Sequence, residues 1–289
     1  MKKLVMGAAT LAIVAALAVA GGQNDSGAAA AKPAASAGLS GTYTFGGSTT
    51  VAPIAYKALE SFQKDNPGLK ISYEGVGSST GIKQLLAGVY SLAGSSREVK
   101  PEEITAGAKP VNLCMDGISI VVNKDVPVAN IAKEQLAKVY AGEISNWKDL
   151  GGPDAPIIVL NRDETSGTYA AFKELVLDPF KKAYRKDALV AKENGEIAAK
   201  VASTPNSIGY VGMAFVDQVV SAGGKTLSID GVEPTMANVV NKSYSLSRFL
   251  FLVTKGDPAD GSVQKAFIDY LLSAKGQAIV KSVGYIPLP

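Results

Sequence analysis

The clearest pattern in the chain is a short apolar run that leads through a polar turn into residues with helical spacing. Residues 157–160 are uniformly apolar, which predicts a short buried strand. Residues 161–168 contain Arg162 and small hydroxyl residues and end in Gly-Thr. After them, apolar side chains recur at spacings of three and four over residues 169–176, which predicts a helix. The pattern therefore predicts a strand, a turn and a helix around Arg162.

The same order of elements is predicted twice more near the start of the chain. Residues 42–45 alternate like a strand, residues 46–50 form a turn rich in Gly, Ser and Thr, and apolar residues at helical spacing follow up to Phe62. Residues 70–86 repeat this arrangement, and a further turn with two serines and an arginine occupies 94–97. The chain thus contains four hydroxyl-rich turns, and two of them carry an arginine.

Later segments continue the alternation of strands and helices. Buried strands are predicted at 117–122, 206–211 and 247–253, an amphipathic helix is predicted at 131–140, and the last helix begins near 262. Alternation of this kind is typical of α/β proteins. We expect the strand at 247–253 to lead back toward the elements formed by the start of the chain.

The four turns allow two interpretations. Each can be an independent helix cap, because Ser and Thr side chains accept N–H groups at helix starts. Together they can form one site, because ligands of α/β sheets lie beyond the carboxyl ends of the strands, where such turns gather. Helix N-termini present free N–H groups and arginine adds a planar charged fork, so the guest that fits is a small oxyanion. The number of turns and the two arginines favour the shared anion site.

Composition narrows the chemistry further. The chain has 289 residues and is 47% hydrophobic, which is enough for one large core or two modest domains. It has no His and a single Cys, Cys114, so zinc and haem sites and Ser–His or Cys–His nucleophile pairs are nearly excluded. We therefore expect no metal, no cofactor and no catalytic residue, and we expect Cys114 to be a buried small hydrophobe. The net charge of +3 gives no indication of a nucleic-acid partner.

The start of the chain has the layout of an export signal. Residues 1–20 carry two lysines, an apolar stretch and a small-residue cleavage site, which predicts a signal peptide. Residues 21–40 are rich in Ala, Gly, Ser and Pro and are predicted to form a flexible tether. Bacterial lipoproteins carry a Cys directly after such a signal, but Gly21 and Gly22 occupy that place, so lipidation there is not supported. We expect an exported protein that is periplasmic or associated with the cell surface.

Three motifs and two supporting stretches resemble a known family. The motifs are 46–53, 77–82 and 162–168, and the supporting stretches are 142–147 and 284–288. In this order they are similar to the phosphate-binding proteins that serve bacterial ABC-type phosphate importers. The resemblance implies the α/β type II periplasmic-binding-protein fold, in which two lobes of mixed sheets flanked by helices are joined by a two-stranded hinge. It also implies that phosphate is enclosed in the cleft between the lobes.

The resemblance and the order of the predicted elements together give a division into lobes. Residues 41–117 and 249–289 are expected to form one lobe, since three hydroxyl turns lie early and an apolar strand near Phe249 returns late. Residues 118–248 are expected to form the other lobe.

The resemblance also implies which residues contact the ligand through hydroxyl groups, backbone N–H groups or arginine. Glu164 matches a family carboxylate that pairs with the binding arginine, and Ser48 and Ser79 are expected behind the ligand contacts. The contacts themselves fall on Thr49, Thr50, Val51, Ser78, Ser96, Arg162, Ser166, Gly167 and Thr168.

One position departs from the best-known branch of this family. That branch has an Asp that accepts the phosphate proton where this chain has Ser96, and Arg97 follows it. Arg97 either binds the anion directly or pairs with nearby acids, and we favour direct contact because guanidinium groups bind oxyanions through charge-assisted hydrogen bonds.

Inorganic phosphate and the membrane permease of an ABC importer are the partners that the resemblance implies, and we expect a monomer. Three alternatives stay open. The guest can be another oxyanion, such as sulfate or molybdate, the protein can be an exported phosphatase, or it can be a surface adhesin. The lack of His and of any nucleophile paired with a base argues against the enzyme.

Overall fold

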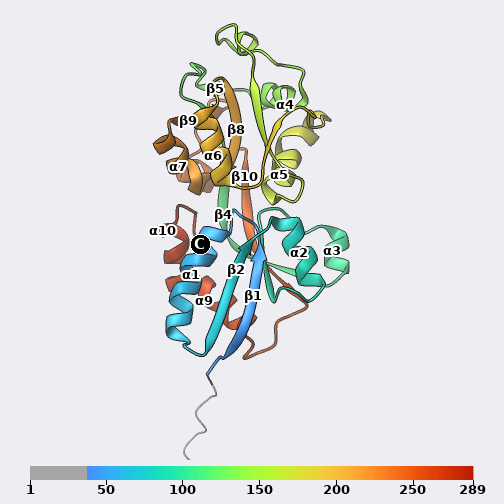
Figure 1. Cartoon of the computed structure of the whole chain (residues 1–289), viewed down its shortest axis with the longest axis vertical. Helices are drawn as coiled ribbons and strands as arrows, with labels where there is room; N and C mark the ends of the chain where they lie inside the picture. The colour runs from blue at the N-terminus through green and yellow to red at the C-terminus, as the bar shows by residue number, and fades with distance from the viewer. Residues whose placement is uncertain (1–37, 289) are drawn as a thin grey trace, which may run out of the picture. The chain divides into compact units, whose positions relative to one another are not determined.

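The structure, a computed structural model, describes residues 38–288 and consists of strands and helices that alternate along the chain (Figure 1). The predicted signal peptide, residues 1–20, and residues 21–37 of the predicted tether lie outside the described residues. Among the helices described, none has the length and apolar character needed to cross a membrane. The strands are β1 (Gly41–Gly47), β2 (Leu69–Gly75), β3 (Leu92–Ser95), β4 (Ala108–Asn123), β5 (Asn130–Ile131), β6 (Ile158–Arg162), β7 (Leu189–Ala191), β8 (Ser207–Gly212), β9 (Gly224–Ile229) and β10 (Ser247–Lys255).

Helices connect most of the strands. The α-helices are α1 (Ala52–Asp65), α2 (Ser78–Leu86), α3 (Pro101–Thr105), α4 (Lys133–Ala141), α5 (Gly167–Phe172), α6 (Asn194–Ser203), α7 (Val216–Ala222), α8 (Met236–Val240), α9 (Val263–Leu272) and α10 (Ala274–Ser282). Shorter helical segments are η1 (Trp147–Leu150), η2 (Lys173–Leu177), η3 (Asp178–Phe180) and η4 (Met213–Phe215).

The strands form one mixed sheet, in which β4 is the longest member. The order along the sheet is β2-β1-β3-β10-β4-β8-β6-β7, with β9 paired to β4 and β5 paired to β9. The first part of β4, from Ala108 to Gly117, pairs antiparallel with β10. Its last part pairs with β8 and β9. One continuous strand therefore belongs to both halves of the sheet.

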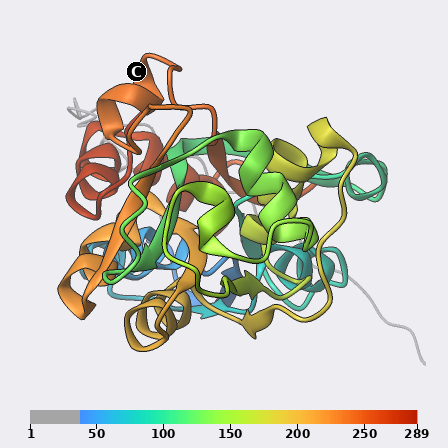
Figure 2. The same ribbon diagram turned by 90° about the horizontal axis from the view of Figure 1, so that it is seen from above.

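Each half of the sheet has helices and buried apolar residues on both faces, so the described chain has two lobes (Figures 1 and 2). In the first lobe, one core cluster includes Phe45 of β1 and Phe267 of α9, and a smaller one on the opposite face includes Leu85 of α2. In the second lobe, the larger cluster includes Phe172 of α5, and the smaller one includes Val201 of α6. The two larger clusters share no residue.

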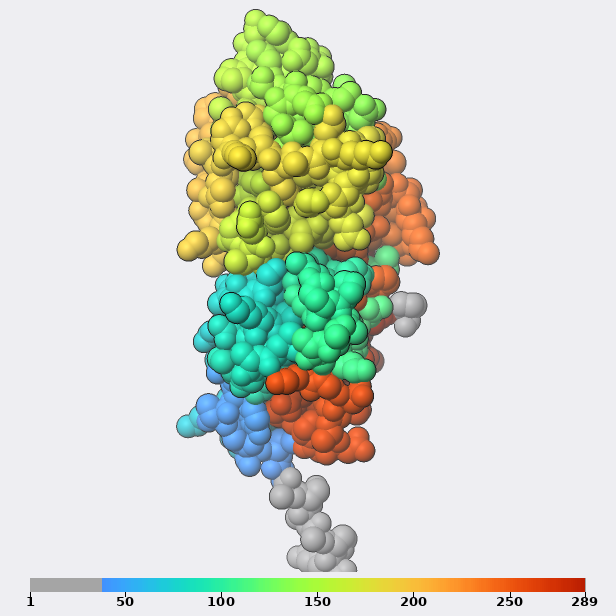
Figure 3. Space-filling view, turned by 90° about the vertical axis from the view of Figure 1, so that its right-hand side faces the viewer, coloured from blue at the N-terminus to red at the C-terminus, as the bar shows by residue number. Residues whose placement is uncertain are grey.

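The lobes meet along one seam, where the teal segments around α2 and α3 face the yellow and yellow-green segments of the second lobe (Figure 3). A backbone hydrogen bond crosses this seam, from the N–H of Ser79 to the carbonyl of Thr165 at 3.0 Å. The turns that carry the candidate ligand residues lie at this level of the molecule.

The predicted secondary structure is largely confirmed. The strands predicted at 157–160, 206–211 and 247–253 correspond to β6, β8 and β10, and the helix predicted at 131–140 corresponds to α4. Cys114 is fully buried, as expected. The helix predicted at 169–176 is confirmed with a difference, because α5 ends at Phe172 and the chain continues through η2 as a wider π turn.

Candidate functional site

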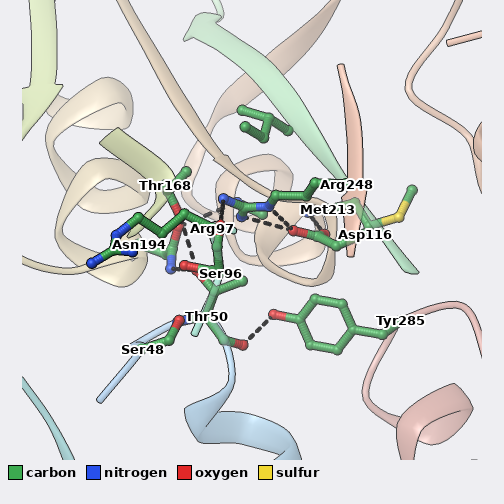
Figure 4. Close-up of polar contacts among 12 residues, drawn as sticks. Ser48, Thr50, Ser96, Arg97, Asp116, Thr168, Asn194, Met213, Arg248 and Tyr285 are labelled. Carbon is green, nitrogen blue, oxygen red and sulfur yellow. Dashed lines mark hydrogen bonds and ion pairs between the residues drawn. The ribbon is translucent and has the colours of Figure 1, made fainter. Parts of the chain in front are cut away.

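The hydroxyl-rich turns of both lobes converge on one buried cluster (Figure 4). The Oγ1 atoms of Thr50 and Thr168, one from each lobe, lie 3.0 Å apart. The Oγ atoms of Ser78 and Ser96 lie 3.3 Å apart, and the backbone N–H of Ser96 donates to the Ser78 Oγ at 3.1 Å. All four side chains are buried. The turns are therefore not only separate helix caps, because they share one polar cluster.

Gly167 permits this close approach of the lobes. A Cβ atom at position 167 would lie 2.2 Å from the Ser78 Oγ and 2.6 Å from the Ser96 Oγ. Both distances are too short for nonbonded atoms, so a side chain at this position would push the two serines away. The first residue of α5 therefore packs directly on the first lobe, and its backbone rather than a side chain faces the cluster.

Two of the predicted site residues also shape their own turns. The Ser48 Oγ accepts the backbone N–H groups of Thr50 at 3.1 Å and Val51 at 3.3 Å, which fixes the turn before α1. Ser166 is the N-cap of α5, and its Oγ accepts the N–H of Tyr169 at 3.2 Å. Capping uses the acceptor side of a hydroxyl, so the O–H group of Ser166 remains a donor for a further partner.

Arg162 is a buried cation with neutral partners. Its Nη2 donates to the Thr49 Oγ1 at 3.0 Å and to the Lys192 carbonyl at 2.6 Å, and its Nη1 donates to the Asn194 Oδ1 at 3.2 Å. The ion pairs of residues 38–288 give it no carboxylate, and its Nε is buried without a hydrogen-bond partner. Burial lowers the pKa of the guanidinium from its usual value, and the charge of Arg248 acts in the same direction. The charges of Asp163 and Glu193 act in the opposite direction but form no ion pair with the guanidinium, so an anion in the cluster would be its direct counter-ion.

Asn194 joins Arg162 to the hydroxyl cluster, and the sequence analysis missed it. Its Oδ1 accepts from Arg162 and from the N–H of Gly212 at 3.2 Å, and its Nδ2 donates to the Thr50 Oγ1 at 3.0 Å. Asn194 begins α6 directly after the edge strand β7. The signal that could have found it is a further strand–turn–helix unit, but β7 has only three residues and two of them are exposed.

Arg97 lies beside the cluster in a salt bridge with an acid. Its Nη2 and Nη1 contact the two carboxylate oxygens of Glu103 at 2.7 and 2.8 Å, and Nη2 also donates to the Ser79 Oγ at 3.2 Å. Arg97 therefore pairs with a nearby acid, the less favoured of the two arrangements expected from the sequence. The Nε of Arg97 is buried and has no partner, so it is the guanidinium donor left for an anion. Direct contact of Arg97 with a ligand stays a prediction.

The structure does not bring Glu164 to Arg162, contrary to the expected pairing. Glu164 is exposed, and no ion pair of the described residues includes it. The reason is local, because the backbone N–H and the hydroxyl of Thr165 both donate to the Asp163 carboxylate and fix the turn with Glu164 on its outer side. The guanidinium of Arg162 instead donates to the backbone carbonyl of Lys192 and to the side-chain amide oxygen of Asn194.

A second buried ion pair adjoins the cluster, and the sequence analysis did not predict it. Arg248 donates to the Asp116 Oδ2 from Nε at 3.0 Å and from Nη2 at 2.8 Å. Burial raises the pKa of the Asp116 carboxyl, and the ion pair with Arg248 counteracts this rise. The two residues are directly opposite each other on β4 and β10.

The site is built from hydrogen-bond donors and has little that could drive a reaction. Thr50, Thr168, Ser78 and Ser96 contact hydroxyl and amide groups rather than a general base. Within residues 38–288, no cluster of three or more His, Cys, Asp or Glu side chains could hold a metal ion. Buried N–H, O–H and guanidinium donors around one point can bind a small oxyanion.

Comparison with known proteins agrees with this geometry. The two-lobed fold and donor-rich site define a substrate-binding protein, and the family model for the PBP superfamily domain matches residues 32–275. The chain belongs to the family of phosphate-binding proteins PstS. It is 38% identical over 248 residues to the phosphate-binding protein PstS of Borreliella burgdorferi, with 84% of this chain and 88% of that protein covered.

Solved structures show the same fold. A putative phosphate ABC transporter substrate-binding protein with bound phosphate from Clostridium perfringens matches with a TM-score of 0.79 and 36% identity, over 86% of this chain and all of that one. An ABC-type phosphate transport receptor from Vibrio cholerae matches with a TM-score of 0.71 and 31% identity, over 86% of this chain and all of that one.

Proposed function

We propose that the protein is an exported receptor that binds inorganic phosphate between its lobes and delivers it to the permease of an ABC importer. The observation that carries the proposal is Arg162, a buried cation that lacks a carboxylate partner in the described chain and faces hydroxyl groups of the opposite lobe. The names of the relatives support phosphate as the ligand and transport as the role. Those relatives are named as binding proteins, which argues against an exported phosphatase.

The proposed binding mode uses donors from both lobes. Thr49, Thr50, Val51, Ser78 and Ser96 are proposed to contact phosphate from the first lobe, together with the Nε of Arg97. Arg162, Ser166, Gly167 and Thr168 are proposed to contact it from the second lobe. Hydrogen bonds to a charged group contribute about 1.5–3 kcal/mol each. A fraction of ten such bonds, after the cost of closing the lobes, reaches the roughly 8 kcal/mol of a micromolar complex.

The proposed moving parts are the two lobes. We place the first lobe at residues 41–117 and 249–289 and the second at 118–248, with β4 and β10 as the hinge. The register supports this division, because Ser247 pairs with Gly117 where the two strands pass from one half of the sheet to the other. Export, a monomeric state and docking to a permease are parts of the same proposal, and size-exclusion chromatography with light scattering tests the monomer.

Calorimetry of the purified protein, freed of endogenous anion, tests the proposed ligand. Phosphate, sulfate and molybdate are titrated under identical conditions, and phosphate is expected to bind most tightly. A chromogenic phosphate ester is incubated with the same preparation to detect turnover. If sulfate or molybdate binds more tightly than phosphate, that anion is the ligand instead. If hydrolysis of the ester copurifies with the protein, the protein is a phosphatase.

A further inference from the structure

Arg248 and Asp116 form a buried ion pair on the two strands that join the lobes. The Cα atoms of the two residues are register partners on β10 and β4. The side chain of Arg248 is 6% exposed and that of Asp116 is fully buried. Neither residue belongs to one of the four hydroxyl-rich turns, so nothing in the turns explains why a charged pair is buried here.

The pair makes one polar contact to each lobe. From Arg248, the Nη1 donates to the carbonyl of Ser96 in the first lobe at 2.8 Å. From Asp116, the Oδ1 accepts the backbone N–H of Met213, which follows β8 of the second lobe, at 3.0 Å. Figure 4 shows the guanidinium of Arg248 extending from β10 toward Ser96 and Thr168, with Asp116 beside the Arg248 side chain. The positive end of the pair therefore faces the hydroxyl cluster.

Two further observations place this charge close to the other site residues. Burial lowers the pKa of Arg162, and the charge of Arg248 adds to this effect. Arg248 and Arg97 also line one cavity of 360 Å³ with Ala171 of α5. This cavity lies beside the hydroxyl cluster, since Thr50, Ser78 and Thr168 do not line it. The cluster is thus bordered by three arginines, of which two are paired with carboxylates and Arg162 is not.

We propose that Arg248 is a third arginine of the anion site, that it binds the ligand from the hinge, and that Asp116 is its positioning residue. This inference rests on the proposed phosphate-binding function. The fork of a guanidinium has five N–H donors in a fixed plane, so Arg248 can bond Asp116, the Ser96 carbonyl and one anion oxygen at the same time. Because Arg248 stands on the hinge, the ligand then contacts both lobes and the strands that connect them.

Two variants of Arg248 and one control test the proposal by phosphate calorimetry and by thermal denaturation without phosphate. Arg248→Gln is expected to weaken phosphate binding by at least about 100-fold, because a charged donor to the anion is lost. Arg248→Lys keeps the charge and is expected to fold like the parent but to bind about 10-fold more weakly, because an ammonium group lacks the planar fork. Arg185→Gln is the control, since Arg185 forms an ion pair with the exposed Asp187 at 2.6 Å, and it should bind like the parent.

The role of Asp116 is tested by a double-mutant cycle. Asp116→Asn alone is expected to weaken binding, because Arg248 loses its fixed orientation. If Asp116 acts through Arg248, the variant Asp116→Asn/Arg248→Gln should bind no more weakly than Arg248→Gln alone. Multiplied losses would show that Asp116 acts independently and would overturn the positioning role.

The outcomes separate this inference from the proposed function. If Arg248→Gln and Arg248→Lys both bind phosphate within about threefold of the parent, the proposal that Arg248 binds the anion is wrong. If Arg248→Gln fails to fold, Arg248→Lys decides alone, because parent-like affinity of that variant excludes a role for the fork. A parent protein that binds no phosphate would instead refute the proposed function itself.

Discussion

At the scale of single residues, Arg162 is the side chain on which the proposed anion site most depends. Neutral oxygens of Thr49, Asn194 and Lys192 accept its hydrogen bonds. Neutral groups solvate a buried cation only in part, so binding of an anion removes a cost that the folded protein already carries.

Arg162→Ala is therefore expected to weaken phosphate binding by about 2–5 kcal/mol, because a buried anion loses a charged partner. The melting temperature without phosphate should change little, since the uncompensated charge is removed together with its hydrogen bonds. Calorimetry and thermal denaturation measure the two effects. Phosphate binding as tight as in the parent would show that the turn around Arg162 is not the site.

The hydroxyl group of Ser96 leads to a second prediction at this scale, on how phosphate affinity depends on pH. A hydroxyl can donate or accept, so it does not repel a fully deprotonated ligand as a carboxylate would. The nearby carboxylates of Glu103 and Asp116 are each neutralised by an arginine. We expect affinity to rise between about pH 5.5 and 8.5, the range in which phosphate loses its second proton.

Ser96→Asp is the matched variant and should reverse this slope and sharpen the rejection of sulfate. Calorimetry over the same pH range measures both proteins. An affinity that falls steadily with pH in the parent would indicate an acceptor for the phosphate proton other than Ser96.

Part of the candidate site could be predicted from the sequence, because its residues lie in turns with a recognisable composition. Thr50, Ser78, Arg162 and Thr168 lie in turns whose Gly, Ser and Thr content indicates a helix start, and the structure brings their turns together. The Asp116–Arg248 pair is different, because 132 residues separate its members and neither lies in a recognisable turn. Only the register of β4 and β10 brings them together, and register is a property of the folded sheet.

At the scale of elements, most strands and helices could be predicted because their apolar periodicity is strong. The extent of β4 could not, since the sequence predicts a buried strand only at residues 117–122. The preceding stretch from Ala108 contains Lys109, Pro110 and Asn112, which do not indicate a strand. It is a strand because β10 pairs along its whole length.

The short helix α3 gives a prediction about acid stability through Glu103. Burial alone raises the pKa of the Glu103 carboxyl, but hydrogen bonds from Arg97 and from the Lys100 backbone outweigh it and hold the pKa below 4.5. A lowered pKa in the folded state stabilises the protein above the unfolded value, and this stabilisation is lost as pH falls through the folded value. We expect the melting temperature to decrease as pH falls below 4.5.

Glu103→Gln should melt a few degrees lower than the parent at pH 7 and show a shallower decrease in acid. Glu102→Gln is the control, because its side chain is 71% exposed on the same helix and lies 3.9 Å from Lys100. Scanning calorimetry at several pH values makes the comparison. Equal acid profiles for the parent and Glu103→Gln would show that the Arg97–Glu103 pair has no part in acid stability.

At the scale of the whole described chain, the distance between the lobes depends on Gly167. Phosphate is expected to draw the lobes together and lower the radius of gyration in solution scattering. Gly167→Ala places a methyl group 2.2 Å from the Ser78 Oγ, so full closure is expected to be hindered. This variant should keep a larger radius of gyration with phosphate present and bind it more weakly.

Gly195→Ala is the matched control in the second lobe, because its Cβ would meet the flexible side chain of Gln218 no closer than 3.3 Å. It should close like the parent. A Gly167→Ala variant that closes and binds as the parent does would show that the lobes do not need this close approach.

The α/β class and two-lobed fold could be predicted at this scale from the family resemblance, and both are confirmed by the comparisons. The boundaries at 117 and 248 stay a prediction, because one strand passes through both lobes without a linker. A domain boundary is easiest to recognise in sequence where a linker of different composition separates the domains. No such linker lies between these lobes, because the sheet continues from one to the other.

The continuity of β4 has a consequence for folding cooperativity. Leu113 and Cys114 belong to the core of the first lobe, while Ile118 and Ile120, a few residues later on the same strand, belong to the core of the second. Unfolding of either lobe would expose part of a strand that the other needs, so neither half is an autonomous folding unit. Calorimetric melting should show a single transition whose van't Hoff and calorimetric enthalpies agree. A gene fragment that encodes one lobe would then yield an incomplete sheet rather than half a receptor.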